Sequence, residues 1–363
     1  MKKLKLMIVF ILCLMVVSAC SNNSVNEGGK PQTTATPEPT AAQEQAAPTA
    51  AIEEAAPTPE VTQPAEKIDI SIAALKGPTA IGMVKLMEDA KAGTTANTYQ
   101  FTIAGMADEI STGLVKGDFD IAAVPCNLAS VLYNRTKGQI TLAGINTLGV
   151  LYVIETGNQI NTVEDLKGKT IYSTGKGTTP QFTLNYLLSA YGIDPEKDVT
   201  IEYKTEATEV AAILSQSSDA VAMLPQPYVT TVMMNNDKVR IALDVAKEWE
   251  AVSADGSSVV TGVVVVNSDF LKEHKEAVDT FLQEYSASTT YVNENIDAAS
   301  ALVEQYDIFK AAVIKKALPF CNITMIQGED MKAKVSGYLT ALYNQDPQSV
   351  GGALPGDDFY YVP

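Results

Sequence analysis

A glycine- and threonine-rich stretch, Gly175-Lys176-Gly177-Thr178-Thr179, directly precedes a predicted helix that begins at about Pro180. Free backbone N–H groups at a helix start, beside hydroxyl groups and a lysine, favour a negative group or a carbonyl oxygen. The stretch lacks the spacing and the GK[ST] ending of a Walker phosphate-binding loop. It therefore predicts a contact with a small ligand, and a plain turn with a helix N-cap is the alternative.

Other short polar stretches are candidates for the same ligand because they follow predicted strands or lie inside one. They are Lys76-Gly77-Pro78-Thr79, Pro125-Cys126-Asn127, Asn146-Thr147, and the pair Gln226 and Tyr228 in a proline-bracketed turn. Asparagine and glutamine amides both donate and accept hydrogen bonds. A tyrosine ring can stack on a flat solute. For Lys76–Thr79, Asn127 and the Gln226 turn, a purely structural role as turn or helix cap is equally compatible with the sequence.

The residues that acid–base or metal chemistry requires are scarce. The single histidine, His274, lies in the charged run KEHKEA, and no nucleophile–base pair is evident. No spacing of cysteine, histidine or carboxylates suggests a metal site. The sequence therefore predicts a binding protein without cofactor or metal, not an enzyme.

These candidate residues are positioned by a plan that occurs twice. Strand 68–75, a Gly-Pro turn and a helix are followed by a short helix and the strand 120–124. Strand 170–173, a Gly-rich turn and a helix are followed by the same pair about a hundred residues later. Alternating strands and helices predict an α/β fold with mostly parallel sheets, in which ligands lie beyond the carboxyl ends of strands. Chance agreement of the two halves is the alternative.

Two long apolar stretches, 142–155 and 257–267, are predicted to be strands that cross between two lobes as a hinge, and buried core strands are the alternative. The expected organisation is a first lobe of residues 67–152 plus 264–363 and a second lobe of residues 153–263. About 297 residues exceed what one core usually serves. Helices are predicted at 270–294, 298–317 and 329–343. Trp249, the only tryptophan, is expected to pack in the second lobe, with ligand contact as the weaker alternative.

The amino terminus has the pattern of an exported lipoprotein. Three lysines precede the apolar run 6–17, which is too short to span a bilayer and is typical of a signal peptide. Residues 1–19 are the predicted signal, and Cys20 is the predicted lipidation site. Residues 20–66 are rich in Pro, Thr, Ala and Glu and are predicted to be a disordered tether. The chain is thus expected to be extracytoplasmic and anchored to the membrane through lipid on Cys20.

The composition limits the partners. The chain has 43 acidic and 26 basic residues, and without the three lysines of the signal its formal charge is −20. Nucleic acid binding is excluded, because a basic patch is its expected footprint. Only Cys126 and Cys321 remain in the folded part, in the similar contexts PCN and FCN. Sequence cannot show their separation, so a disulfide and two free thiols both stay open.

The chain resembles the solute-binding proteins of ABC importers in several pieces: GPTAIGMVKLM, LVKGDFDIAAVP and TVEDLKGKTIYSTGKGTTPQFTLNYLL. The lipoprotein cleavage motif (lipobox) Val17-Ser18-Ala19-Cys20 and the tether add to this resemblance. The similar branch handles nitrate, sulfonates, bicarbonate and thiamine-pyrimidine precursors. The resemblance covers the chain from about residue 67 and implies a two-lobed type II periplasmic-binding-protein fold. It also implies closure on a small solute and delivery to an ABC permease and ATPase. A monomer is expected.

The resemblance leaves the function open at two points. A ligand-sensing or signalling lipoprotein would use the same fold, and some thiamine-pyrimidine synthases share it. The folded part contains only Arg135 and Arg240, and neither lies in a predicted ligand turn. Since strongly anionic ligands usually recruit arginine, the sequence favours a small neutral or mildly anionic heterocycle.

Overall fold

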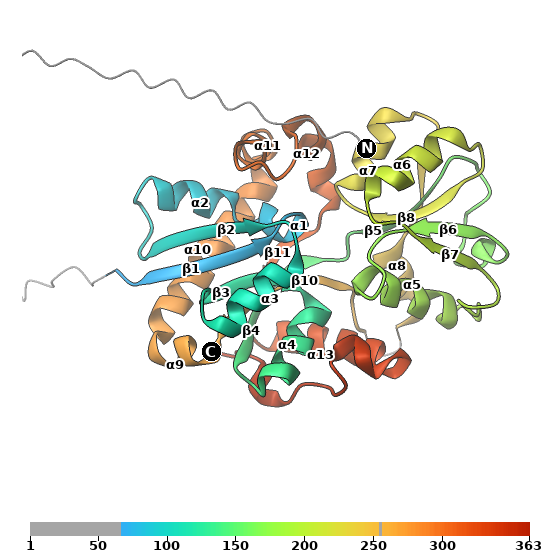
Figure 1. Cartoon of the computed structure of the whole chain (residues 1–363). Coiled ribbons are helices and arrows are strands. Elements are labelled where there is room, and N and C mark those ends of the chain that lie inside the picture. Colours follow the sequence, from blue (N-terminus) through green and yellow to red (C-terminus); the bar gives the residue numbers. More distant parts are fainter. Residues whose placement is uncertain (1–66, 254–255) are drawn as a thin grey trace, which may run out of the picture. The chain divides into compact units, whose positions relative to one another are not determined.

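The computed structural model describes residues 67–253 and 256–363 (Figure 1). The predicted signal peptide, Cys20 and the tether lie outside the described residues. The described residues belong to one structural unit. No helix in the described part of the chain is long and apolar enough to cross a membrane.

A first, six-stranded sheet has the order β11-β4-β10-β3-β1-β2. Its strands are β1 (Asp69–Leu75), β2 (Thr98–Ala104), β3 (Ile121–Pro125), β4 (Ile140–Leu148), β10 (Val260–Asn267) and β11 (Ile323–Ile326). Strand β1 is parallel to both β2 and β3, whereas β10 is antiparallel to both β3 and β4. Strand β11 is antiparallel to β4.

A second, five-stranded sheet has the order β7-β6-β8-β5-β9. Its strands are β5 (Leu151–Glu155), β6 (Thr170–Ser173), β7 (Thr200–Tyr203), β8 (Val221–Pro225) and β9 (Arg240–Asp244). Strand β6 is parallel to β7 and β8, and β5 is antiparallel to β8 and β9. The strand order 2-1-3 of the first sheet is therefore repeated as 7-6-8 in the second.

The predicted α/β fold with a repeated plan is confirmed. The helices α3 (Ala107–Lys116) and α6 (Ala207–Gln216), which precede β3 and β8, are offset by one hundred residues. In each sheet most strands run in the same direction, as expected, and the pairing is mixed because β10 and β11 in the first sheet and β5 in the second run against the others. Antiparallel pairing enters through β10 and β5, each of which lies beside the parallel strands of its sheet and runs against them.

Helices cover both faces of each sheet (Figure 1). One face of the first sheet packs on α1 (Pro78–Ile81), α2 (Val84–Lys91), α10 (Lys275–Glu294), α11 (Ile296–Gln305) and α12 (Ala311–Ala317). Its other face packs on α3, α4 (Cys126–Thr136) and α13 (Gly328–Gln345). In the second sheet α5 (Thr179–Ala190) covers one face, and α6 and α7 (Tyr228–Asn235) cover the other. The short α9 (Ser268–Glu273), α8 (Val245–Val252), and the 3-10 turns η1 (Val163–Leu166), η2 (Leu318–Phe320), η3 (Pro347–Val350) and η4 (Asp357–Phe359) complete the chain.

Three predicted elements are divided in the structure. The stretch 142–155 forms β4 and β5, which are separated only by Gly149 and Val150 yet belong to different sheets. The predicted helix 270–294 is interrupted at His274, and 298–317 is divided into α11 and α12. Hydrophobic periodicity continues across these breaks, so it could not reveal them.

The piece TVEDLKGK is explained by its local contacts. The carboxylate of Asp165 accepts hydrogen bonds from the backbone N–H groups of Asn161 and Thr162, at 2.9 and 3.0 Å. Leu166 is fully buried in the core of the second sheet. Gly168 has a φ of +78°, a left-handed conformation that favours glycine. The piece therefore fixes the turn that leads into β6.

The Asp165 contacts make a prediction about acid stability. Backbone N–H donors hold the pKa of this carboxylate below its ordinary value of 3.8. A carboxylate with a lowered pKa stabilises the fold above its ordinary pKa, and this contribution is lost as the pH falls through the lowered value. The melting temperature of wild type should thus fall below about pH 5. Asp165→Asn should show a smaller fall, measured by circular dichroism, whereas the exposed control Asp237→Asn should follow wild type.

Candidate functional site

The predicted ligand turns follow β1, β3, β6 and β8. Because β1 is parallel to β3, and β6 to β8, the carboxyl ends of each pair lie at the same edge of their sheet. The turns of one sheet are thereby brought together, as the sequence predicted. That these residues contact a ligand stays a prediction.

A buried polar cluster joins the turn after β1 to β4. The amide nitrogen of Asn146 donates to the carbonyl of Thr79 at 3.0 Å and to the hydroxyl of Tyr285 at 2.9 Å. Its oxygen accepts from the Thr147 hydroxyl at 3.1 Å. We call Thr79, Asn146, Thr147 and Tyr285 the floor cluster. The Asn146 amide is largely used within this cluster, so its first role is to hold the turn after β1.

Gly262 of β10 provides the space for the floor cluster. A Cβ atom at this position would lie 2.5 Å from Asn146 Oδ1 and 2.5 Å from Thr79 Cγ2. The next residue towards the amino terminus, Thr261, lies at a register shift between β10 and β4. Its hydroxyl is buried and has no hydrogen-bond partner among the described residues. A buried hydroxyl without a partner costs about 1–3 kcal/mol, so Thr261 is suited to a ligand contact.

One hydrogen bond connects the helix starts of the two sheets. The hydroxyl of Thr179, at the start of α5, donates to Asn127 Oδ1 in α4 at 3.1 Å. The Asn127 amide nitrogen donates to the carbonyl of Ser349 at 3.2 Å. Both side chains are buried. Two predicted ligand residues from different halves of the chain are thus in direct contact.

The Gly-rich stretch before α5 is the most exposed of the predicted turns. Gly175 and Gly177 have φ values of +75° and +76°, and Lys176, Gly177 and Thr178 are exposed. The N–H of Gly177 donates to Gln181 Oε1 at 2.8 Å, and the Thr178 hydroxyl donates to the Gly175 carbonyl at 2.8 Å. The Gly177 N–H and the Thr178 hydroxyl are therefore already hydrogen-bonded within this segment.

Positive charge around these turns is limited. Lys76 forms an ion pair with Asp307 at 3.2 Å. Arg240 forms an ion pair with the buried Glu155, which lies opposite Val221 at the amino end of β8 and so away from the turn after β8. Lys176 is exposed and has no ion pair among the described residues. The turns thus have amides and hydroxyls, with Lys176 as the unpaired cation.

The turn after β8 lies beside a cavity of about 290 Å³. Gln226 lines this cavity, and its Oε1 accepts from the backbone N–H and the hydroxyl of Thr230 at 3.2 and 2.8 Å. Tyr228 packs edge-on against Phe309, with ring centroids 5.3 Å apart, and burial raises the pKa of its phenol. The Tyr228 ring is thus engaged by a protein ring of the α11–α12 region.

In the described part of the chain, Cys126 and Cys321 are buried and free, so the structure has two free thiols and not the disulfide. Cys126 packs in the cluster with α4 and α13, whereas Cys321 packs in the cluster on the opposite face of the first sheet. The sheet thus separates residues that the similar contexts PCN and FCN suggested as a pair.

Burial also predicts low thiol reactivity. It raises the pKa of the Cys126 thiol and raises that of Cys321 to about 12. In protein lacking residues 1–66, neither thiol should react with Ellman's reagent at mildly alkaline pH. Both should react in guanidinium chloride without any reductant. If fewer than two thiols react in denaturant, the result would support the disulfide instead.

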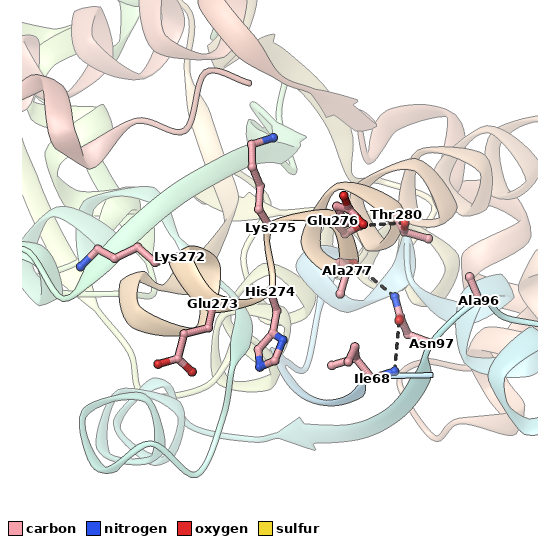
Figure 2. A pocket seen from close by; sticks show the side chains of 10 residues that line it. All are labelled: Ile68, Ala96, Asn97, Lys272, Glu273, His274, Lys275, Glu276, Ala277 and Thr280. Carbon is pink, nitrogen blue, oxygen red and sulfur yellow. Dashed lines mark hydrogen bonds between the residues drawn. The ribbon is translucent and has the colours of Figure 1, made fainter. Parts of the chain in front are cut away.

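A larger cavity of about 500 Å³ lies away from all the predicted ligand turns (Figure 2). It is lined by the α9–α10 junction around His274 and by the segment before β2. Lys272 pairs with Asp269 and Lys275 pairs with Asp279, at 3.0 and 2.7 Å. Its lysines are already paired and Glu273 and Glu276 also line it, so this cavity offers no evident cation for an anionic ligand.

Sequence reasoning missed Tyr285, Thr261 and Gly262. A glycine inside the β-branched run VTGVVVV does signal a close backbone or side-chain approach, so Gly262 was recognisable. Tyr285 lies in the middle of α10 and Thr261 in a strand, and nothing in their local sequence marks them. Among the described residues no group of histidine, cysteine or carboxylate side chains could hold a metal ion.

The family comparison agrees with the resemblance seen in the sequence. Residues 137–299 match the family model described as NMT1/THI5 like. No curated protein matches the chain in sequence.

Solved structures show the same fold. An ABC transporter protein from Parabacteroides distasonis has a TM-score of 0.68 at 23% identity, covering 82% of this chain and 99% of that one. The periplasmic aliphatic sulphonate binding protein SsuA from Escherichia coli has a TM-score of 0.64 at 17% identity, covering 82% and 93%. The periplasmic nitrate-binding protein NrtA from Synechocystis PCC 6803 has a TM-score of 0.56 at 12% identity, covering 77% and 82%. The chain therefore has the periplasmic-binding-protein type II fold.

Proposed function

From an NMT1/THI5-like domain within a periplasmic-binding-protein type II fold, we propose that the chain is the solute-binding protein of an ABC importer. It captures a small molecule between two lobes and delivers it to a permease and ATPase. The observation that carries the proposal is the Thr179–Asn127 hydrogen bond, which joins predicted ligand turns of the two sheets. The predicted lobes, residues 67–152 plus 264–363 and residues 153–263, need shifted boundaries, because β5 begins at Leu151 in the second sheet and β10 begins at Val260 in the first.

The proposed solute is a small neutral or mildly anionic heterocycle. Its contacts come from the predicted set: Lys76, Gly77, Pro78, Thr79, Pro125, Cys126, Asn127, Asn146, Thr147, Gly175, Lys176, Gly177, Thr178, Thr179, Gln226 and Tyr228. Thr261 joins this set because its buried hydroxyl lacks a partner among the described residues. The pairing of Lys76 with Asp307 supports a ligand without full negative charge.

A thermal-shift screen of metabolites tests this proposal. A solute that binds only the native state stabilises it by about 2.7 kcal/mol when present at a hundred times its Kd. Uncharged heterocycles should therefore raise the melting temperature more than nitrate or alkanesulfonates do. Thr261→Val should reduce the shift, while Val115→Ala, at a 57% exposed side chain near the carboxyl end of α3, should not. If no solute raises the melting temperature and purified protein carries none, the proposal is overturned.

We further propose that Cys20 anchors the protein outside the cell membrane, with residues 20–66 as a tether. The pattern of lysines, short apolar run and Ser18-Ala19-Cys20 supports this. A Cys20→Ala variant should leave the membrane fraction and appear in the soluble extracytoplasmic fraction. Continued membrane association of that variant would contradict lipid anchoring.

A further inference from the structure

The cavity beside Gln226 has features of a small-molecule site of its own. One wall comes from α7 and β9, with Met233, Met234 and Ile241, and the other from α12 and η2, with Lys316 and Phe320. Its volume of about 290 Å³ corresponds to about ten water-sized groups, at about 30 Å³ for each water. The cavity therefore fits a molecule of about ten heavy atoms.

The apolar side chains of this cavity are unusually accessible. Met233, Met234 and Phe320 are 36%, 41% and 46% exposed, and they are among the few large apolar side chains with such exposure in the described chain. Methionine is flexible and polarisable, and it adapts to apolar ligands of different shape. A ligand that covers these side chains would gain the free energy of removing their apolar surface from water.

Two polar groups in the cavity could bind the polar end of a ligand. The Gln226 side chain is only 1% exposed, and the donors from Thr230 fix its oxygen, because a backbone N–H can only donate. Its amide nitrogen has no partner among the described residues, although the side chain lines the cavity. Lys316 is exposed and takes part in no ion pair in the described chain, whereas its neighbour Lys315 pairs with Asp297. A buried donor and an unpaired cation both favour an anionic acceptor.

We propose that this cavity binds a small apolar carboxylate, such as an aryl or branched-alkyl acid. The apolar body lies against Met233, Met234 and Phe320, and the carboxylate accepts from Lys316 and from the Gln226 amide. Because the walls come from helices of both sheets, the bound acid favours the arrangement of the two lobes seen here. This inference shares Gln226 with the contact set of the solute proposed above but assigns a second ligand of different chemistry, and the two are tested with different ligands.

Three probes of similar size and different charge test the site: benzoate, benzamide and benzylammonium. Each is titrated into the full chain, and binding is measured by calorimetry and ligand-observed NMR. Benzoate should bind at least tenfold more tightly than benzylammonium, with benzamide between them. Met234→Glu should weaken benzoate at least tenfold, and Lys316→Glu should reverse the order of benzoate and benzylammonium. The matched control Met106→Glu, at a 60% exposed methionine elsewhere, should change neither.

Several outcomes would overturn the proposal. One is that no probe binds, and another is that all three bind equally, which would indicate apolar adhesion only. A third is that Met234→Glu leaves benzoate binding unchanged. If no probe binds but Met234→Glu dissolves a dimer seen by sedimentation, the face is a protein contact and the site is refuted. Since the metabolite screen uses other ligands, either proposal can fail while the other holds.

Discussion

Replacing Trp249 by alanine is expected to lower the free energy of unfolding by about 3–5 kcal/mol. The indole is fully buried, and its nitrogen donates to the Ser257 hydroxyl at 3.1 Å. Its ring stacks on Tyr186 at 3.8 Å between centroids and contacts Tyr338 at 5.4 Å. Tyr186 belongs to α5 beside the second sheet, and Tyr338 to α13 beside the first. The side chain therefore fills the core in which both halves meet.

Urea denaturation followed by far-ultraviolet circular dichroism measures this loss. Trp249→Phe keeps an aromatic ring and should lose clearly less than Trp249→Ala. Met106→Ala, at an exposed side chain, should stay within about 0.5 kcal/mol of wild type. A loss below about 1 kcal/mol for Trp249→Ala would show that the ring is not part of a well-packed core.

Replacing Arg240 by methionine should have an effect of similar size, about 3–5 kcal/mol. The Glu155 side chain is 1% exposed, and Arg240 supplies its counter-charge while also donating to the carbonyl of Ile160. The Glu155 carboxylate further accepts from the backbone N–H groups of Gln159 and Ile160. Removing only the arginine leaves a buried charge without its partner, which costs more than the pair itself contributes.

A double variant separates the charge from the packing. Arg240→Met with Glu155→Gln should be less destabilised than Arg240→Met alone, because no unpaired charge remains. Lys272→Met breaks a pair whose side chains are each 73% exposed, and it should cost no more than about 1 kcal/mol. Equal unfolding free energies for the single and the double variant would show that the buried charge is not the cause.

The repeated strand–turn–helix plan was predictable because its signals are local. A glycine-containing turn follows β1 and β6. An aspartate precedes β3 and β8, and each of these strands ends in a proline. The family resemblance then indicated the right fold. The crossing of 142–155 between two halves of the fold was expected. Its break into two strands was not, because both parts are apolar and buried and only pairing partners distant in sequence distinguish them.

The candidate site was predictable only in outline. The turns lie at the predicted strand ends, but the groups that pair with the amides of Asn146 and Asn127 come from far along the chain. Tyr285 is 139 residues from Asn146, and Ser349 is 222 residues from Asn127. Trp249 was expected in the second lobe alone, whereas it packs with α13 residues of the first sheet. Such contacts depend on how the two halves meet, which local sequence does not encode.

The position of β10 has a consequence for the order in which the chain folds during synthesis. Strands β3 and β4 are consecutive in the chain, yet β10 lies between them in the sheet. The first sheet therefore cannot close until residue 267 has left the ribosome, and until then both strands keep an unpaired edge. All five strands of the second sheet lie within residues 151–244, so that sheet can close earlier although it is made later. The amino-terminal half should thus depend on chaperones until the carboxyl-terminal half supplies its missing strand.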